Sequence, residues 1–427
     1  MYVSDMLIST FVSYKCRPNI KRNQIVCKYE NKRKQASKKS EHNLSGYQML
    51  YLKIKEYKPK YVFCISGGPI MPLIDQFHDD CTTQMIVPTN EQSMMYMMKG
   101  YSAKSEEYSF GMVTSGPGIT NCITGLMDAK QDGVPLMLIS GQVETSRIGS
   151  DAFQECNAVG LSQYVTKMSY QIKHPNEIVH VFDHLMAIAN TDRKGPVHLD
   201  IPKDCLQQNI TSSINVALSF TNSQLNTNQL NTNHSITSIN NIHFIAELIS
   251  KSEKPLIIAG QGALSAGYLI NHLVDVYQIP ITTTLHAIGI YDESKPLSLK
   301  MHGMHGTIYA NKAIQNSDCI IAIGNRFDDR TIGNLDSYAP FAMQAFKERR
   351  GGIIHCNIDP NVFHKTIEQS YFFQLESKKF VRELLMYMKL KNRDKWLKKI
   401  SYWKEMYPIR YQAMKNNKLT TQHVLKY

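Results

Sequence analysis

The sequence predicts an α/β fold made of two doubly wound parallel-sheet domains joined by a polar linker. Three observations support this prediction. Short apolar runs alternate with helical patterns through the first half, a second alternating series starts at Pro255, and a polar tract separates the two. Alternation of this kind is typical of a parallel sheet that helices cover on both faces.

Each expected strand is a short apolar run, and each expected helix has apolar residues at helical spacing. In the first series the strands are expected at 62–65, 85–87, 110–113, 136–139 and 197–199, and the helices at 71–77, 93–103, 119–130 and 177–189. In the second series the strands are expected at 256–259, 281–284, 319–323 and 353–357, and the last helix at 378–388.

Composition divides the chain into five regions. We expect a basic N-terminal extension (1–43), a first domain (44–208), an Asn/Ser/Thr-rich linker (209–241), a second domain (242–390) and a helical connector (391–427). The linker cannot bury a core because it is almost entirely polar. The extension is equally compatible with an organellar transit peptide and with a disordered basic tail.

Charge and cysteine usage exclude several classes of protein. The net charge of +12 gathers at 15–42 and 389–404, without the motif support that a nucleic-acid interface needs. The nine cysteines form no C-x-x-C motif and no metal spacing with histidine, which indicates a reducing compartment and no zinc site. No apolar run of about 18 residues predicts a membrane span.

Glu91 is a lone carboxylate that follows a predicted strand and begins a predicted helix. Such a group can hold or share a proton with a ring nitrogen of a cofactor. The alternative is an acid that complements the helix dipole, and spacing alone favours this alternative. We interpret the methionines that follow, between 94 and 98, as core residues.

Glycine-rich turns follow several predicted strands. Ser115-Gly116-Pro117-Gly118, Gly67-Gly68-Pro69 and Gly260-Gln261-Gly262 would let the backbone approach a ligand, although each signal is weak alone. Segments 303–307 and 324–330 also lie at strand–helix junctions, where ligands gather in open α/β sheets. There Arg326 and Arg330 could bind phosphate or carboxylate, or pair with Asp328 and Asp329.

Taken together, these segments resemble the large catalytic subunit of acetolactate synthase (acetohydroxyacid synthase), a thiamine-diphosphate enzyme. The resemblance runs from about Gly46 to the C-terminus. It rests on the ordered stretches 115–118, 141–143, 151–155, 194–197, 201–204, 304–311 and 324–330. Segment 351–355 and the spacing of Trp396, Trp403 and Tyr407 look most like the fungal, mitochondrial branch.

The resemblance implies thiamine diphosphate, Mg²⁺ and FAD as cofactors. Glu91 would hydrogen-bond the aminopyrimidine ring of thiamine diphosphate, and Gly68 would lie beside its thiazolium ring. Phe153, Gln154 and Lys203 would line the active-site approach. Asp329 and Arg330 would lie at the substrate channel. The positions that resemble FAD contacts are Arg193, Gly262, Thr284, Leu285, Gly303, Met304, His305, Gly324, Asn325, Arg326, Phe327, Asp328, Asn357 and Ile358.

The implied activity is decarboxylation of pyruvate and condensation with a second 2-keto acid, pyruvate or 2-ketobutyrate, the first common step of branched-chain amino-acid synthesis. The implied partners are further copies of the chain and a regulatory small subunit, with no nucleic acid and no membrane. The fungal likeness implies a mitochondrial location, with the cytoplasm as the alternative and secretion excluded. Departures from the family pattern are Pro69, Asn90, Glu144, His302 and Asn357.

Family enzymes carry a third α/β domain, in which a Gly-Asp-Gly motif and a later Asn hold Mg²⁺ and the diphosphate. The 427 residues contain no Gly-Asp-Gly, so we expect this third domain and all metal ligands to be absent from this chain. We therefore expect catalysis to need a partner chain with that domain. The alternatives are a non-catalytic homologue that binds FAD or pairs with a full-length subunit, and another thiamine-diphosphate decarboxylase or lyase.

Overall fold

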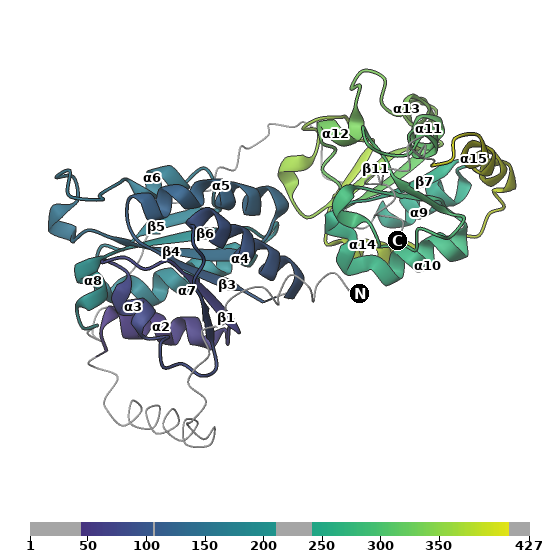
Figure 1. Ribbon diagram of the computed structural model, residues 1–427. Helices are drawn as coiled ribbons and strands as arrows, with labels where there is room; N and C mark the ends of the chain where they lie inside the picture. Colours follow the sequence, from purple (N-terminus) through teal and green to yellow (C-terminus); the bar gives the residue numbers. More distant parts are fainter. Residues whose placement is uncertain (1–43, 106, 211–240, 410–427) are drawn as a thin grey trace, which may run out of the picture. The chain divides into compact units, whose positions relative to one another are not determined.

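The computed structural model describes residues 44–105, 107–210 and 241–409. The predicted basic extension, almost all of the linker and the last part of the connector lie outside these ranges. The chain divides within the linker into two compact units, 1–226 and 227–427, and each is described by itself (Figure 1).

The first unit is a six-stranded parallel sheet with the order β2-β1-β3-β4-β6-β5. Helices α4, α5 and α6 pack on one face, and α2, α3, α7 and α8 on the other (Figure 1). The strands are β1 (Tyr61–Cys64), β2 (Gln84–Ile86), β3 (Ser109–Val113), β4 (Leu136–Gln142), β5 (Met168–Gln171) and β6 (Val197–Pro202). The helices are α2 (Gly46–Glu56), α3 (Met71–Asp75), α4 (Glu91–Ser105), α5 (Pro117–Asp132), α6 (Ala158–Ser162), α7 (Ile178–Asn190) and α8 (Lys203–Gln207), with 3₁₀ turns at Thr145–Arg147 and Pro175–Glu177.

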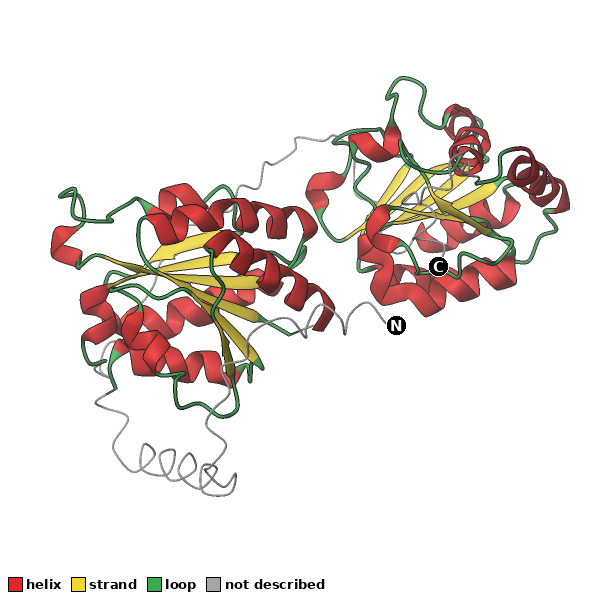
Figure 2. Cartoon of the chain, in the orientation of Figure 1, coloured by secondary structure: helices red, strands yellow, loops and turns green. Residues whose placement is uncertain are grey.

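The second unit is another six-stranded parallel sheet, with the order β12-β11-β10-β7-β8-β9, between two layers of helices (Figure 2). Its strands are β7 (Pro255–Ala259), β8 (Ile281–Thr283), β9 (Ser298–Met301), β10 (Cys319–Ile323), β11 (Gly352–Asn357) and β12 (Tyr371–Gln374). Its helices are α9 (Ile242–Lys251), α10 (Gly267–Tyr277), α11 (Ile308–Asn316), α12 (Asp329–Ile332), α13 (Pro340–Lys347), α14 (Ser377–Leu385) and α15 (Asp394–Met406), with 3₁₀ turns at Gln261–Ala266, Leu285–Ala287 and Pro360–Val362.

Strand β10 shows why apolar runs form these sheets. Cys319, Ile321 and Ile323 belong to the core under α9, α10 and α14. Ile320 and Ala322 belong to the core under α11, α13 and α15. Alternate residues of a strand face opposite sides, so a strand covered on both faces must be apolar at every position. The predicted fold class, two parallel-sheet α/β domains, is confirmed.

The strands that the sequence did not predict are β5, β9 and β12, and all three lie at sheet edges. They are only partly buried. Strands β5 and β9 carry no continuous apolar run, and that of β12 covers only 371–373. Helix α15, which we expected within a connector, packs into the core of the second unit through Trp396, Ile400 and Trp403.

A buried arginine joins the start of α15 to two other helices. Arg393 is only 3% exposed. Its Nη2 donates to the carbonyl of Ile249 at 2.9 Å and its Nη1 to the carbonyl of Tyr277 at 3.0 Å. These carbonyls lie in the last turns of α9 and α10, where positive charge is favourable, and the Ile249 carbonyl also accepts from the N–H and hydroxyl of Ser252.

We predict that Arg393→Met lowers the free energy of unfolding of the second unit by about 3 kcal/mol, because two helix ends lose a charged donor. Tryptophan fluorescence during urea unfolding measures this unit alone, since the chain has two tryptophans and both lie on α15. Lys251→Met is the control. It removes the exposed ion pair with Glu247 and should cost less than about 1 kcal/mol. Equal losses in the two variants would contradict the prediction.

Candidate functional site

The carboxyl edge of the first sheet gathers most of the residues predicted for its site. Because all paired strands of this sheet are parallel, every strand-to-helix loop leaves the sheet at the same edge. The predicted residues at this edge are Gly68 after β1, Glu91 after β2, Phe153 and Gln154 in the loop after β4, and Lys203 after β6.

The strand order reverses between β1 and β3, and ligands of open α/β sheets bind at such a point. The two loops touch there, because a Cβ on Gly67 would lie 2.4 Å from the Cβ of Thr114. A Cβ on Gly141, in β4, would lie 2.7 Å from that of Pro69. A Cβ on Gly68 would meet nothing within 4 Å, so this residue borders open space beside closely packed neighbours.

Glu91 is the first residue of α4 and is half-buried. The side chain of Asn90 caps this helix, since its Oδ1 accepts from the backbone N–H of Gln92 at 2.8 Å. The Glu91 carboxylate instead faces α5, where its Oε2 accepts from Asn121 Nδ2 at 3.0 Å. Sequence reasoning missed Asn121, which lies one helical turn beyond the Gly-Pro-Gly turn. Its amide fixes the direction of the carboxylate.

Two hydroxyl groups at the same edge are buried without hydrogen-bond partners among the described residues. They are Thr114 Oγ1 and Ser115 Oγ, directly before the N-terminus of α5. Buried polar groups are nearly always hydrogen-bonded, so these hydroxyls indicate a place for a polar ligand. The unpaired backbone N–H groups of a helix N-terminus favour an anionic or polar ligand at the same position.

The loop that carries Phe153 and Gln154 packs over the Gly-Pro-Gly turn. A Cβ on Gly116 would lie 2.8 Å from the carbonyl oxygen of Gln154. The Glu155 carboxylate accepts hydrogen bonds from the backbone N–H groups of Gly149 and Ala152, the latter at 3.1 Å, and the Gly149 bond contributes most to lowering the pKa of Glu155. Phe153 is 87% exposed, so its ring is available to a bound molecule.

Methionines of α4 contribute to the core and not to the site. Met94, Met95 and Met98 are fully buried against α5 and the sheet, which confirms their interpretation as core residues. Arg193 lies at the opposite, amino edge of this sheet, where its Nη2 donates to the carbonyl of Gln131 at the end of α5. The structure therefore does not bring Arg193 together with Glu91.

In the second unit, the strand order reverses between β7 and β10. Glycines let the loops after these two strands touch there. A Cβ on Gly260 would lie 2.2 Å from the carbonyl oxygen of Gly324. Gly324 has a φ of +61°, and a Cβ there would lie 2.4 Å from the carbonyl carbon of Gly262. The backbone of the two loops can touch in this way only without side chains.

The other predicted FAD positions of this unit also lie at its carboxyl edge. They are Thr284 and Leu285 after β8, Gly303, Met304 and His305 after β9, Asn325, Arg326, Phe327 and Asp328 after β10, and Asn357 with Ile358 at the end of β11. Some of these side chains have structural contacts. Phe327 is buried in the core, and Asp328 caps α12 by accepting from the Thr331 N–H at 3.0 Å.

The loop after β9 is held against α12. The backbone N–H of Met304 donates to the carbonyl of Arg330 at 2.8 Å, and Asn311 hydrogen-bonds both backbone groups of Gly303. The Arg330 guanidinium lies 3.8 Å from the Asp329 carboxylate, and both side chains are largely exposed. This pair remains accessible to a carboxylate ligand.

Four of the second unit's side chains with buried, unpartnered polar atoms in the described part of the chain lie on or just after β8, β9, β10 and β11. The atoms are Thr283 Oγ1, His302 Nε2, Asn325 Nδ2 and His355 Nδ1. His355 Nε2 donates to the carbonyl of Asn325 at 2.8 Å, so its Nδ1 can accept. Together with the glycine contacts, these donors and acceptors suit a large polar cofactor such as a dinucleotide.

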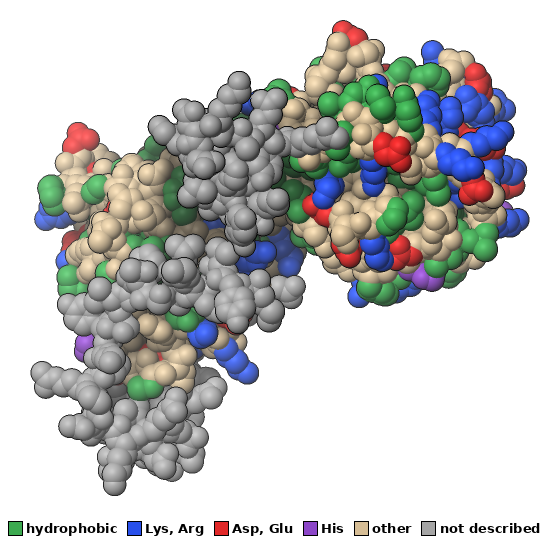
Figure 3. Space-filling model, turned by 45° about the vertical axis from the view of Figure 1, so that its right-hand side comes forward, with side chains coloured by type: hydrophobic (Ala, Val, Ile, Leu, Met, Phe, Trp, Pro, Cys, Tyr) green, Lys and Arg blue, Asp and Glu red, His purple; other side chains and the backbone are tan. Residues whose placement is uncertain are grey.

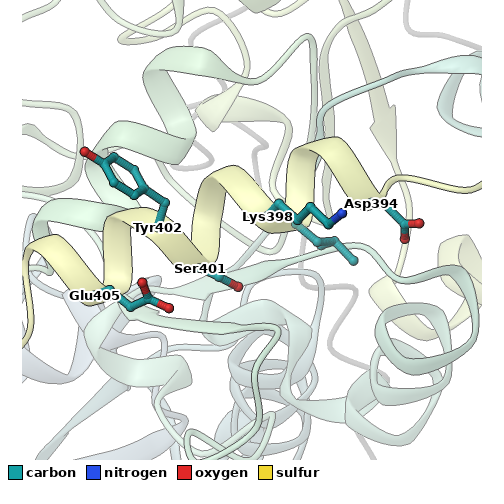
Figure 4. A pocket seen from close by; sticks show the side chains of 6 residues that line it. Asp394, Lys398, Ser401, Tyr402 and Glu405 are labelled. Carbon is teal, nitrogen blue, oxygen red and sulfur yellow. The ribbon is translucent and has the colours of Figure 1, made fainter.

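Other parts of the surface have fewer features of a ligand site. A shallow depression on α15 is lined by side chains of that one helix, and Tyr402 and Glu405 point to different sides of it (Figure 4). Lys and Arg side chains gather on one side of the second unit, as expected for a solvated basic helix face (Figure 3). Within residues 44–105, 107–210 and 241–409 there is no group of three or more potential metal ligands, and no helix is long and apolar enough to span a membrane.

Comparison with known proteins agrees with this geometry. Residues 44–161 match the thiamine pyrophosphate enzyme N-terminal TPP binding domain, and residues 242–384 match the thiamine pyrophosphate enzyme central domain. The chain belongs to the thiamine pyrophosphate enzymes. Within this family it is homologous to acetolactate synthase catalytic and large subunits from fungi and bacteria.

Three relatives illustrate the extent of the match. The mitochondrial acetolactate synthase catalytic subunit of Saccharomyces cerevisiae is 36% identical over 390 residues, 90% of this chain and 56% of the relative. The mitochondrial acetolactate synthase of Schizosaccharomyces pombe is 36% identical over 86% of this chain and 56% of the relative. The acetolactate synthase large subunit of Lactococcus lactis is 33% identical over 91% and 65%, respectively. The chain thus spans about half to two thirds of these thiamine pyrophosphate enzymes.

The buried histidines generate a prediction about pH. Burial lowers the pKa of His302 and of His355 to about 4. A histidine whose pKa falls on folding stabilises the fold only while it is neutral. Its contribution is complete above the unfolded pKa of about 6.5 and is lost as the pH falls from there towards 4.

We therefore predict that the second unit loses up to about 3 kcal/mol per buried histidine between pH 6.5 and pH 4. Urea unfolding followed by tryptophan fluorescence at several pH values measures this loss. His302→Gln should reduce the pH dependence. An unchanged pH dependence in His302→Gln would show that this residue does not cause it.

Proposed function

We propose that this chain supplies the pyrimidine side and the central domain of an acetolactate synthase catalytic subunit that works with thiamine diphosphate. The observation that carries the proposal is the Glu91 carboxylate, oriented by Asn121 at the point where the first sheet reverses its strand order. Thiamine diphosphate, when bound, provides the nucleophilic carbon and the electron sink that decarboxylation of a 2-keto acid requires.

Each residue of the first unit has a defined task in this proposal. Glu91 holds a proton at a ring nitrogen of the aminopyrimidine, and Asn121 keeps the carboxylate in place. Gly68 lets a ring approach the backbone closely, because nothing fills the space beside its Cα. Phe153 excludes water from the reacting keto acid, while Gln154 and Lys203 supply polar contacts to it.

In the second unit we propose that FAD binds beside the point where Gly262 and Gly324 touch. The buried unpartnered atoms of Thr283, His302, Asn325 and His355 support this proposal. Asn357 already donates to the carbonyl of Asn325 at 2.8 Å, so it acts by holding that loop. Arg330 is proposed to bind the carboxylate of an incoming 2-keto acid.

The remaining cofactor contacts are assigned to other parts of the assembly. We propose that Mg²⁺ and the diphosphate are bound by a chain carrying the family's third domain, since the described residues contain no suitable ligand cluster. Further copies of this chain and a regulatory small subunit are the proposed partners. A mitochondrial location is proposed because the fungal relatives are mitochondrial proteins.

A second candidate function follows from the second unit alone. Its glycine contact and buried polar atoms do not depend on the first unit, so the chain could bind FAD without catalysing the reaction. In that case it would pair with a full-length catalytic subunit as a non-catalytic homologue.

One assay separates these functions. Acetolactate formation from pyruvate is measured with thiamine diphosphate, Mg²⁺ and FAD, on the chain isolated with its native partners and on the chain alone. We predict activity in the complex only. Glu91→Gln should lower it by at least about 100-fold, because the proton-sharing group is lost. Glu107→Gln, an exposed acid on the loop before β3, is the control and should retain full activity.

Three results would change the account. Full activity in Glu91→Gln would exclude the assigned role of Glu91. Activity of the chain alone would exclude the need for a partner. An inactive complex with the visible absorbance of bound flavin would favour the second candidate function.

A further inference from the structure

A connected set of polar side chains, all buried except the half-buried Gln171, crosses the first sheet beneath the loop of residues 143–157. Its members come from β4, α6, β5 and β6. They are Ser140, Gln142, Ser162, Ser169, Gln171, His198 and Asp200. A fully buried carboxylate such as that of Asp200 is costly unless it is well hydrogen-bonded.

Asp200 is the centre of this set. Its Oδ1 accepts from Ser140 Oγ at 2.5 Å. Its Oδ2 accepts from Gln171 Nε2 at 2.7 Å and from Gln142 Nε2 at 3.3 Å. Burial raises the pKa of Asp200 to about 6, so the carboxylate is largely ionised at neutral pH and holds these donors firmly.

Gln142 connects the carboxylate to the loop. It is 1% exposed, at the end of β4. Its Nε2 donates both to Asp200 and to the backbone carbonyl of Cys156, the latter at 3.0 Å. Its Oε1 accepts from the backbone N–H of Val143 at 2.9 Å. One side chain thus binds the first residue of the loop and a residue near its end.

The far end of the loop is held by the same set. Helix α6 follows the loop, and its Ser162 Oγ lies 2.7 Å from His198 Nδ1. The other ring nitrogen of His198 lies 2.8 Å from Ser140 Oγ. Burial lowers the pKa of His198 to about 3, so the neutral ring joins the two serines.

The loop needs such support because its backbone is strained. Asp151 has a φ of +54° and Gln154 a φ of +61°, a region that residues other than glycine rarely adopt. Strained residues of this kind persist only where surrounding contacts hold them in place. The hydrogen bond from Gln142 to Cys156 lies two residues from the strained Gln154.

We propose that Gln142, held by Asp200, is the positioning residue for loop 143–157, and that it fixes Phe153 and Gln154 at the carboxyl edge of the first sheet. The idea that this loop contacts a reacting keto acid rests on the proposed function. The mechanical role of Gln142 does not, since it depends only on contacts within the first unit.

Cysteine alkylation tests the proposal on the full chain without cofactor. Iodoacetamide labelling, measured residue by residue by mass spectrometry, follows Cys156 in the loop, the exposed Cys81 and the buried Cys122. Gln142→Met should label Cys156 about tenfold faster, since the loop opens more often after losing its hydrogen bond. Cys81 and Cys122 should be unchanged, and Asp200→Asn should give the same pattern.

Gln171→Met is the matched control. It also removes a hydrogen bond to Asp200, but the bond it removes does not involve the loop, so Cys156 should react as in the parent protein. Faster labelling of Cys122 together with Cys156 would show a general loss of packing and overturn the proposal. Equal effects of Gln142→Met and Gln171→Met would overturn it as well. Because no cofactor is present, failure of the proposed function cannot produce either result.

Discussion

Parallel strand pairing is the constraint on which both units depend. In each sheet every paired strand runs in the same direction, so all strand-to-helix loops emerge at one edge. Residues that are far apart in the sequence meet there for this reason. Glu91 and Asn121 are joined across 30 positions, and Asn325 and Asn357 across 32. The parallel arrangement is what brings these long-range partners to one edge of each sheet.

Glycine-containing loops pack closely together at the carboxyl edge of each sheet. In the first unit Gly67 packs against Thr114, and in the second unit Gly260 packs against Gly324. The surrounding chemistry differs. The first edge presents a carboxylate and two buried hydroxyls, whereas the second presents imidazole and amide groups. The same architectural device therefore underlies both proposed sites, one for a proton-sharing ring and one for a dinucleotide.

The central strands and the position of Glu91 at a helix start could be predicted from the sequence, because each depends on local pattern. The proposed cofactor role of Glu91 came instead from the family resemblance. Strand β10 is apolar at every position, and Glu91 stands between a strand and a helix. Edge strand β5 could not be predicted, because it is mostly half-buried and carries no apolar run. Asn121 gave no signal, and Gln142 stood out only as part of the family-like stretch 141–143. Their roles come from hydrogen bonds to partners 30 and 58 positions away. An Asn or Gln side chain does not by itself indicate so distant a partner.

The central claim is that Glu91 pairs with the pyrimidine ring of thiamine diphosphate. A crystal structure of the chain in its native complex with this cofactor tests it most directly. The account predicts a Glu91 carboxylate oxygen about 3 Å from a pyrimidine ring nitrogen, with Asn121 still donating to the carboxylate. A pyrimidine ring bound elsewhere, with Glu91 contacting Asn121 alone, would contradict the account.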